Sequence, residues 1–442
     1  MSGFQRVDVT AANKGKACSV AFITLGCAKN EVDTASMRKR TAEAGFRLVE
    51  DVSEADAVVV NTCSFIQAAT EESLSTIFDI SALPEFERGE KKIIVAGCMP
   101  ARYGGELESE LVEAAAFVPC SKEDDIVDVL SRVLNADAPG SSIVYHPWEG
   151  EPAAYAKISD GCDRFCSFCA IPYIRGPYHS FTFEEIDAAV SELEASGVRE
   201  VTLIAQDTGR WGEDFDTPSN TAKLLSRLAQ GHPLLWFRLM YVEPVGVTDE
   251  LLSVIATHDN VCKYLDVPLQ HASKRILADM NRSGSRAEHL QLVKRIRDRV
   301  PGITLRTTVI VGFPGETDDD FQELLDFLEE AEFDYVGVFA YSAEEGTKAS
   351  LLPHQVSEDV KMQRMQEVRD LADSISHARV AARIGSQMSV LVLGHEEDGQ
   401  LYGRAMCQAP EVDGVTYLSS GKPGDIVSVT IDNTLLYEME GE

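Results

Sequence analysis

The sequence predicts an α/β protein of three consecutive domains, and three observations support that prediction. The first ~145 residues repeat an apolar β-run that is followed by a cysteine. The middle of the chain alternates apolar β-runs with helix-like stretches, and the last ~60 residues hold short β-runs divided by Gly, Asp and Pro. We therefore expect a parallel-sheet α/β domain at 1–145, a partial TIM-type barrel at 146–378 and a small β-barrel at 379–442.

The N-terminal domain is predicted from its repeat of strand, cysteine and helix. Apolar runs at 19–25, 57–61 and 92–96 precede Cys27, Cys63 and Cys98, and helix-like stretches at 31–44 and 66–80 lie between them. This order favours a parallel sheet, whose strands all end at one edge, where open α/β sheets bind ligands. The three cysteines are therefore expected to converge and to hold a [4Fe–4S] cluster with one iron lacking a cysteine. The alternative is that they are small buried side chains, as free cysteines often are.

The central domain is expected to follow a Gly/Pro-rich linker at 140–156. Its expected strands are 155–159, 200–205, 236–240, 264–268, 304–311 and 335–340, and its helices include 183–195 and 317–331. Six βα units predict a partial barrel whose working face is formed by the C-terminal ends of the strands. An amphipathic helix at 356–384 then leads to the last domain, with β-runs at 388–394, 401–406 and 426–432.

A single cysteine motif indicates the chemistry of the central domain. Cys162, Cys166 and Cys169 form a C-x3-C-x2-C loop directly after the first expected strand. Three thiolates can hold three irons of a [4Fe–4S] cube and leave the fourth iron open to an exchangeable ligand. That iron suits chelation of S-adenosylmethionine (SAM), and one electron then cleaves the sulfonium to a 5′-deoxyadenosyl radical. The alternative is structural zinc, but zinc usually takes four ligands, often from two Cys pairs, and no second C-x2-C is present.

Composition limits the partners and the compartment. The 442 residues carry a net charge of −32 and a pI of about 4.6, whereas nucleic-acid-binding domains usually have a pI above ~9. The acidity fits either solubility or a basic protein partner. No apolar run reaches the ~18 residues of a membrane span, and residues 1–20 are expected to be a flexible lead without a signal core. Ten cysteines in such a chain predict a reducing cytoplasm, and four of them fit no ligand pattern: Cys18, Cys120, Cys262 and Cys407.

The motifs and the domain order resemble the methylthiotransferase family of the radical SAM superfamily over nearly the whole chain. Cys27 in TLGCAKNEVD, Cys63 in NTCSFI and Cys98 in AGCMPARY match the family's N-terminal pattern. The C-x3-C-x2-C loop matches the radical SAM triplet. The resemblance implies a second, auxiliary cluster that supplies sulfur, a radical SAM barrel and a C-terminal TRAM domain.

Motif details distinguish two branches of this family. One branch modifies adenosine in transfer RNA, and the other modifies an aspartate of a small-subunit ribosomal protein, the twelfth of its series. The segments LGCAKN, NTCSFIQAA and YLDVPLQHAS resemble the second branch, as does FAYSAEEGT except for Ala343, where proline is usual. From Arg379 to Glu442 the chain has four basic and ten acidic residues, a net charge of −6 that suits a basic protein better than RNA.

Candidate SAM contacts follow three of the expected strands. The resemblance places near SAM the turn GFPGET, with Gly312, Gly315 and Glu316, and the residues Gln206 and Asp207 that end the strand at 200–205. Glycines allow close approach of the backbone to a ligand. Asp266, Gln270 and His271 end a further strand on the same face. Simpler roles remain open for these residues, namely a plain βα turn, a helix cap or a structural hydrogen bond.

Three further residues lie near the cysteine loop. Arg175 is expected either to pair with the SAM carboxylate or to cap the loop. Phe165 and Phe168, inside the loop, are expected to exclude water from the cluster.

The resemblance implies a cytoplasmic enzyme that converts an aspartate β-C–H into C–S–CH3, with two [4Fe–4S] clusters and two SAM molecules per turnover. Its partners are a basic small-subunit ribosomal protein and an electron donor such as flavodoxin, with no membrane and no tight transfer RNA binding. Deletion after about residue 385 is expected to weaken substrate binding and to spare both clusters. A transfer RNA methylthiotransferase and a non-catalytic iron–sulfur scaffold or sensor remain the alternatives.

Overall fold

The computed structural model describes residues 18–136 and 144–442. Residues 1–17 of the expected lead at 1–20 and the first part of the expected linker, 140–143, lie outside these ranges, whereas residues 19 and 20 already belong to a strand. The described residues form two compact units, one within Met1–Ser64 and Ala68–Pro147 and the other within Phe65–Gln67 and Trp148–Glu442. The limits expected between domains at 145/146 and 378/379 stay predictions.

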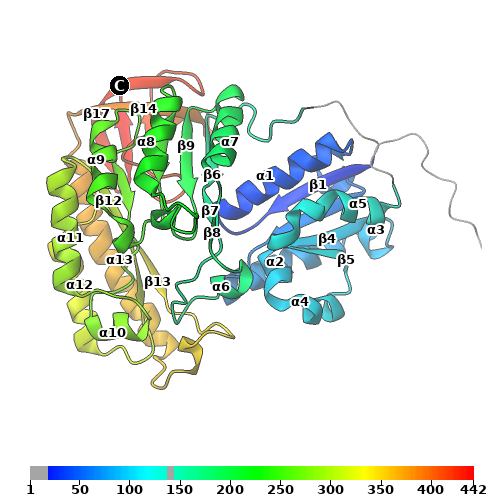
Figure 1. The fold of residues 1–442 in the computed structure, drawn as a ribbon, viewed down its shortest axis with the longest axis horizontal. Helices are drawn as coiled ribbons and strands as arrows, with labels where there is room; N and C mark the ends of the chain where they lie inside the picture. The colour runs from blue at the N-terminus through cyan, green and yellow to red at the C-terminus, as the bar shows by residue number, and fades with distance from the viewer. Residues whose placement is uncertain (1–17, 137–143) are drawn as a thin grey trace, which may run out of the picture. The chain divides into compact units, whose positions relative to one another are not determined.

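The first unit contains the expected parallel sheet. Its strands are β1 (Ser19–Thr24), β2 (Arg47–Leu48), β3 (Ala57–Thr62), β4 (Lys92–Gly97) and β5 (Ala114–Pro119), in the order β2-β1-β3-β4-β5. Figure 1 labels β1, β4 and β5 of this sheet, with helices α1 and α2 beside it. The helices are α1 (Ala28–Glu43), α2 (Gln67–Ser81), α3 (Pro84–Glu87), α4 (Cys98–Glu110) and α5 (Ile126–Leu134). All six residues of β3 are buried, and a separate apolar cluster covers each face of the sheet. Successive strands are added on one side of β1 for β2 and on the other side for β3, so the strand order reverses between β1 and β3. Open parallel sheets bind ligands at such a switch point.

The second unit begins with six parallel strands in chain order. They are β6 (Ala153–Lys157), β9 (Glu200–Ile204), β10 (Trp236–Leu239), β11 (Tyr264–Asp266), β12 (Thr304–Val311) and β13 (Tyr335–Ala340). Two three-stranded sheets, β10-β9-β6 and β11-β12-β13, are linked by a parallel bridge between Phe237 and Val261. This open succession is the expected partial barrel. Its first strand begins two residues earlier than expected, and a short strand, β7 (Ser159–Asp160), follows it and pairs with β8 (His179–Ser180).

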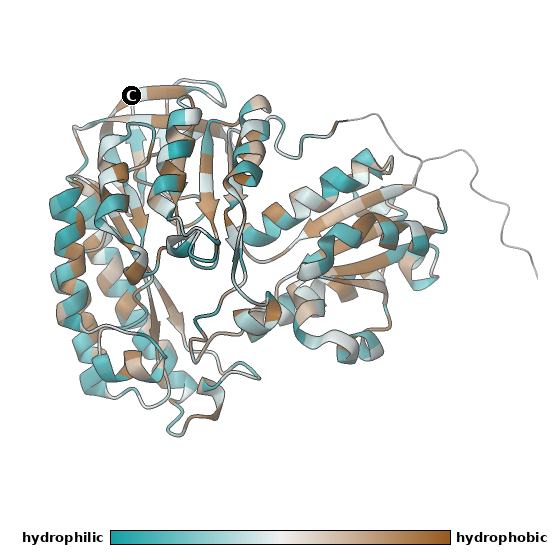
Figure 2. Ribbon diagram, viewed as in Figure 1, coloured by the Kyte–Doolittle hydropathy of each residue, from teal (hydrophilic) through white to brown (hydrophobic). Residues whose placement is uncertain are grey.

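Six helices share the apolar core of this partial barrel and cover its outside. They are α7 (Phe183–Ala195), α8 (Thr221–Gly231), α9 (Asp249–Thr257), α11 (Arg286–Arg299), α12 (Asp318–Ala331) and α13 (Glu358–Ala381). Two short helices, α6 (Ile171–Ile174) and α10 (Lys274–Asp279), follow the cysteine loop and β11. Thr182 and Thr317 each close a capping box at the start of α7 and α12, which fixes where these helices begin. The strands are largely hydrophobic, whereas α11 and α12 alternate hydrophilic and hydrophobic residues (Figure 2). The amphipathic pattern therefore turns one face of each helix toward the sheet.

The C-terminal part is a closed five-stranded barrel in the order β14-β15-β16-β18-β17. Its strands are β14 (Gln387–His395), β15 (Leu401–Ala405), β16 (Thr416–Leu418), β17 (Ile426–Leu435) and β18 (Glu438–Gly441). The first, second and fourth correspond to the expected β-runs. The sequence reasoning missed β16 and β18, which are only three and four residues long and are too short to show an alternating pattern.

This small barrel packs against the N-terminal ends of the central strands. Trp236, Tyr264 and Tyr335, the first residues of β10, β11 and β13, share one buried cluster with Val390, Leu391 and Met439 of the small barrel. Glu200, the first residue of β9, accepts hydrogen bonds from Arg238 at 2.7 Å and from Arg404 at 3.1 Å. The small barrel thus closes the end of the partial barrel that lies opposite the C-terminal strand ends.

Candidate active site

The cysteine loop lies at the C-terminal end of the first barrel strand, on the working face expected from the sequence. Pairing of Ser159 with Ser180 and of Asp160 with His179 closes the base of the loop. Gly161 has a φ of +72°, and a Cβ there would lie 2.1 Å from the carbonyl oxygen of Pro177. Only glycine fits this position, at the entry to the loop that carries the three cysteines.

The three thiols of this loop interact with one another. Burial raises the pKa of Cys162, and it raises the pKa of Cys169 to about 12, with a further increase in each case from the neighbouring cysteines. Deprotonation of Cys162 and Cys169 is therefore unfavourable without a compensating positive charge. Bound metal ions supply that charge and deprotonate their cysteine ligands. This donor set consequently fits an iron–sulfur cluster.

The ligand arrangement also bears on the zinc alternative. Within 18–136 and 144–442, no group of three or more His, Cys, Asp or Glu side chains is arranged to hold one metal ion. A zinc ion requires all of its ligands around one metal position. In a [4Fe–4S] cube each thiolate binds a different iron, so the three sulfurs can lie farther apart. The spacing of these cysteines therefore suits the cube better than zinc.

The residues around the loop take roles that the sequence left open. Arg175 donates to Asp160 at 3.1 Å and is buried at the base of the loop, which favours the capping role. Phe168 packs in a cluster with Phe313 and Tyr341 and shields one side of the loop. Phe165 is 46% exposed and has a φ of +49°. Its ring meets that of Tyr173 edge-on, with 6.4 Å between the ring centroids, and lies outside the buried clusters, so a water-excluding role for Phe165 stays a prediction.

The predicted SAM contacts lie at or just after the C-terminal ends of β9, β11 and β12, but several already form hydrogen bonds within the protein. Asp207 accepts a hydrogen bond from Arg164 at 2.6 Å and another from the amide of Gly209. Asp266 accepts from Arg306 and from the amide of Tyr241. These bonds favour structural roles for both aspartates, the first of which ties the cysteine loop to β9.

The remaining predicted SAM contacts are residues of the turn after β12 and two glutamines. Glu316 accepts hydrogen bonds from the amides of Gly312 and Phe313 and from Arg364, so it fixes the GFPGET turn from within. Gly315 has a φ of +82° in the same turn. Gln270 has a φ of +70° and pairs with Val309 of β12 in an isolated parallel β-bridge. The Oε1 atom of Gln206 is buried and makes no hydrogen bond, so it is available to a donor such as an amino group. The assignment of these residues to SAM stays a prediction.

The N-terminal cysteines also occupy C-terminal strand ends. Cys27 caps α1 after β1, Cys63 follows β3 and Cys98 begins α4 after β4. The register pairs Thr24 with Asn61 and Thr62 with Gly97, so the cysteines that follow are on neighbouring strands. A Cβ on Gly26 would lie 2.6 Å from the Cβ of Cys63. The sheet therefore brings the turns that carry Cys27 and Cys63 into close approach, with Cys98 directly after the next strand, β4.

A buried amide network joins these three turns, and the sequence reasoning did not identify it. Asn30 and Asn61 are fully buried. The side-chain nitrogen of Asn30 donates to Asn61 Oδ1 and to the Thr62 carbonyl, both at 3.2 Å. Asn61 donates to the Asn30 carbonyl at 2.9 Å, and Thr62 donates to the Ala96 carbonyl at 2.6 Å. Each cysteine-bearing turn is thus linked to the next by hydrogen bonds that water does not reach.

Three family models match successive parts of the chain. Residues 19–119 match the uncharacterized protein family UPF0004, residues 156–328 match the radical SAM superfamily and residues 384–442 match the TRAM domain.

The chain is also similar to curated proteins over nearly its full length. It is 40% identical to the ribosomal protein uS12 methylthiotransferase RimO of Natranaerobius thermophilus over 96% of this chain and 98% of the relative. It is 42% identical to RimO of Moorella thermoacetica over 95% of this chain and 97% of the relative. The chain belongs to the RimO family. It is therefore a radical SAM methylthiotransferase, and membership of the radical SAM superfamily implies SAM and a [4Fe–4S] cluster.

Solved structures support the fold of this RimO family member. The radical SAM methyltransferase TsrM from Kitasatospora setae superposes with a TM-score of 0.54 at 13% identity, covering 73% of each chain. The cobalamin-dependent SAM radical enzyme OxsB gives a TM-score of 0.52 at 12% identity, over 81% of this chain and 56% of OxsB. Among the described residues, no helix combines the length and apolarity needed to cross a membrane.

Proposed function

We propose that this chain transfers a methylthio group to the β-carbon of an aspartate in ribosomal protein uS12, in the cytoplasm. The observation that carries the proposal is the identity of 40–42% to relatives named as uS12 methylthiotransferases, which spans at least 95% of this chain. The two sets of three cysteines at C-terminal strand ends support it, because the reaction requires both a radical source and a sulfur donor. The acidic charge of the chain suits a basic ribosomal protein.

Each cysteine set has a separate role in this proposal. Cys162, Cys166 and Cys169 would hold the cluster that supplies an electron to bound SAM. Cys27, Cys63 and Cys98 would hold the auxiliary cluster next to which sulfur is methylated. One SAM supplies the methyl group. A second SAM would be cleaved by one electron to methionine and a 5′-deoxyadenosyl radical, and this radical would take the substrate hydrogen and leave as 5′-deoxyadenosine. An electron donor such as flavodoxin completes the reaction.

The barrel residues bind and orient the reactants. The unpaired oxygen of Gln206 and the backbone of the turn from Gly312 to Gly315 are the groups that we assign to SAM. A radical is selective only when the target hydrogen is held within near-contact distance, so the protein contributes mainly placement. The ion pair of Arg164 with Asp207 keeps the cysteine loop over the strand end where this placement occurs.

The test compares variants of the two cysteine sets. Anaerobically reconstituted protein should contain about eight irons per chain, as two [4Fe–4S] cubes. Cys162→Ala should lose about half of the iron and all cleavage of SAM. Cys63→Ala should also lose about half of the iron but still release 5′-deoxyadenosine, without methylthiolated uS12. The measurements are iron content, 5′-deoxyadenosine by chromatography and the mass of uS12. Full SAM cleavage by Cys162→Ala, or methylthiolation of transfer RNA and not of uS12, would overturn the proposal.

A further inference from the structure

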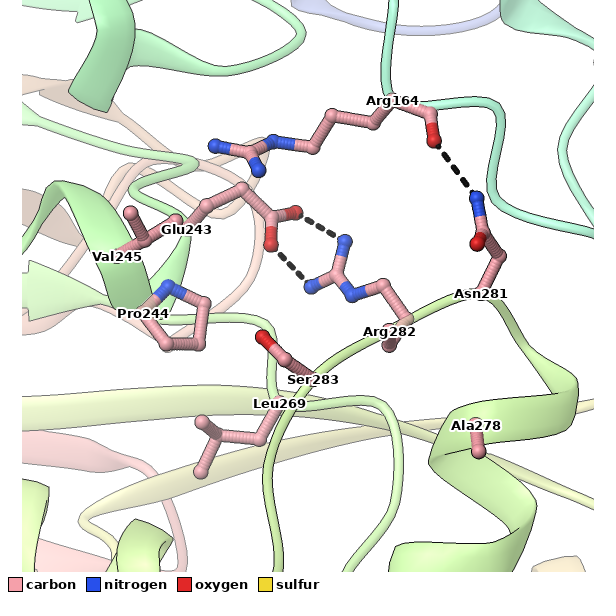
Figure 3. Close-up of a pocket in the computed structure, with 9 residues that line it drawn as sticks. All are labelled: Arg164, Glu243, Pro244, Val245, Leu269, Ala278, Asn281, Arg282 and Ser283. Atoms are coloured by element: carbon pink, nitrogen blue, oxygen red, sulfur yellow. Dashed lines mark hydrogen bonds and ion pairs between the residues drawn. The ribbon is translucent and has the colours of Figure 1, made fainter.

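Four consecutive residues at the C-terminal end of α10 hold the cysteine loop, although more than a hundred residues separate the two segments in the sequence. Asp279 and Met280 accept hydrogen bonds from the side chain and the amide of Ser167, at 2.7 and 3.0 Å. Asn281, with a φ of +57°, donates to the carbonyls of Arg164 and Phe165 at 3.1 and 3.0 Å. The bond to Arg164 is drawn in Figure 3. The fourth residue, Arg282, reaches a cysteine itself.

Arg282 lies between Cys166 and a buried carboxylate. Its Nη1 atom is 3.6 Å from the Sγ of Cys166 and 2.6 Å from Glu243 Oε1, and its Nη2 atom donates to the Pro268 carbonyl at 2.9 Å. The two side chains of the ion pair are only 9% and 10% exposed. Figure 3 shows Arg282 and Glu243 facing each other in a forked pair beside a cavity of about 400 Å³. The guanidinium is therefore held in one orientation, with one N–H directed at the sulfur.

A guanidinium in this position affects a cluster through two physical effects. Hydrogen bonds to the ligand sulfurs and nearby charge both set the reduction potential of an iron–sulfur cluster. The reduced cluster carries one more negative charge than the oxidised cluster, so a donor and a positive charge beside Cys166 stabilise the reduced form. Because the site is shielded from water, the effect is screened less than it would be at the surface.

We propose that Arg282 is a positioning residue that raises the reduction potential of the cluster at Cys162, Cys166 and Cys169, and that Glu243 holds it in place. The inference rests on the proposed assignment of the radical SAM cluster to these cysteines. Glu243 has the opposite charge and lies farther from the sulfur, so it opposes the effect of Arg282 while it orients the guanidinium. Removal of each side chain should therefore shift the potential in opposite directions.

The experiment uses the full-length chain with Cys27, Cys63 and Cys98 replaced by alanine, so that one cluster remains. Its midpoint potential is measured by electron paramagnetic resonance of samples poised at defined potentials. The variants are R282M, E243Q and the double variant E243Q/R282M, which leaves no unpaired charge in the buried site. R286M is the matched control, because Arg286 is four residues further along and pairs with Asp326 and Glu330 instead.

We expect R282M to lower the reduced-to-oxidised ratio at a fixed potential by about tenfold, equivalent to about 59 mV toward more negative values for a one-electron couple. E243Q should shift the midpoint potential toward more positive values. The double variant should have a lower midpoint potential than E243Q, and R286M should have the same midpoint potential as the parent. If the parent holds no cluster, the proposed assignment fails. If the cluster is present and neither R282M nor the double variant lowers the potential, the inference on Arg282 fails alone. If R282M does not assemble a cluster, the midpoint potentials of E243Q and the double variant are compared instead. The inference on Arg282 then fails if the double variant is not lower than E243Q.

Discussion

At the scale of single residues, the N-terminal cysteines depend on amides that are not themselves candidate ligands. Asn61 joins β3 to α1 through its bonds to Asn30 and to Thr34, the latter at 2.9 Å. Cys63 follows Asn61 by two residues, so the network fixes the direction in which the chain leaves the strand. A substitution at Asn61 that keeps the size of the side chain but removes its hydrogen bonds should therefore disturb the auxiliary site most.

We expect Asn61→Leu to lower the free energy of unfolding by about 1–3 kcal/mol, because it leaves buried partners without hydrogen bonds. The iron content should fall from about eight to about four per chain, while SAM cleavage continues at the barrel cluster. The control is Asn260→Leu, since Asn260 donates to three backbone carbonyls in the other unit. This control should lose stability without losing iron. Full iron retention by Asn61→Leu would contradict the positioning role.

Another residue-scale effect concerns a buried carboxyl group in the C-terminal barrel. Burial raises the pKa of Asp413 to about 6, against the opposing attraction of Arg306. Asp413 accepts hydrogen bonds from the hydroxyl of Tyr264 and from the amide of Ala409. Since the unfolded carboxyl has a pKa near 3.9, the folded state binds more protons than the unfolded state between pH ~4 and ~6. Stability from this group is therefore fully present below pH ~4 and is lost as the pH rises toward ~6.

Asp413→Asn should flatten the pH dependence of stability in that window. The measurement is the free energy of unfolding from denaturant titrations between pH 4 and pH 7, and the difference between wild type and variant should change most between pH ~4 and ~6. A constant difference between the two proteins over this range would show that Asp413 has an ordinary pKa.

At the scale of elements, the C-terminal barrel and the central strands share their packing. The first residues of β10, β11 and β13 are buried against it, and Arg238 donates to the carbonyl of Met406 at 2.8 Å. From the sequence, this barrel is expected to be a separate module whose removal spares both clusters. The structure gives a reason to expect otherwise, because its removal exposes the aromatic ends of three strands and the buried charges of Glu200 and Arg238.

We therefore expect a chain that ends at residue 384 to lose the cooperative unfolding of residues 148–384 as well as SAM cleavage. Circular dichroism during thermal unfolding and 5′-deoxyadenosine release are the two measurements. The comparison is Glu200→Gln in the full chain, which weakens the bonds to Arg238 and Arg404 and should cost several kcal/mol, about 3–5 by analogy with broken buried ion pairs. A truncated chain that folds and cleaves SAM normally would restore the view of two independent modules.

At the scale of the whole molecule, the net charge of −32 should govern the encounter with uS12. The turn between β14 and β15 presents three exposed acidic residues, Glu396, Glu397 and Asp398. Besides burial, four carboxylates raise the pKa of Tyr417 on the adjacent strand β16: Glu396, Glu438, Asp398 and Glu440. Acidic groups thus gather on this side of the small barrel, where a basic partner would be attracted over a Debye length of ~8–10 Å.

Reversing all three charges, with lysine at 396, 397 and 398, should slow association with uS12 severalfold and reduce the dependence of association on salt, with little change in dissociation. Stopped-flow binding at several salt concentrations measures both rates. The matched control places lysine at Asp319, Glu329 and Glu330 on α12, which changes the net charge equally. An equal effect of both triple variants would assign the attraction to overall charge. Tight binding of transfer RNA by the unmodified chain at physiological salt would contradict the partner assignment.

The sequence by itself determined the elements of this protein whose signals are local. Spacing within eight residues defined the C-x3-C-x2-C loop, and the repeat of β-run and cysteine placed Cys27, Cys63 and Cys98 at strand ends, because side-chain periodicity and loop spacing are properties of neighbouring residues. Parallel strands then required one shared edge. The family motifs added the resemblance that the full-length relatives confirmed.

Only the tertiary structure decided the strand order β2-β1-β3-β4-β5, the exposure of Phe165, the contact of Arg282 with Cys166 and the closure of the barrel by the C-terminal domain. Arg282 is 116 residues from Cys166, and Glu200 is 204 residues from Arg404. Such pairs leave no period or spacing in the sequence, because a buried charge finds its partner through the packing of whole strands and helices. The cysteines could therefore be predicted, whereas the groups that position them emerged only when the chain was folded.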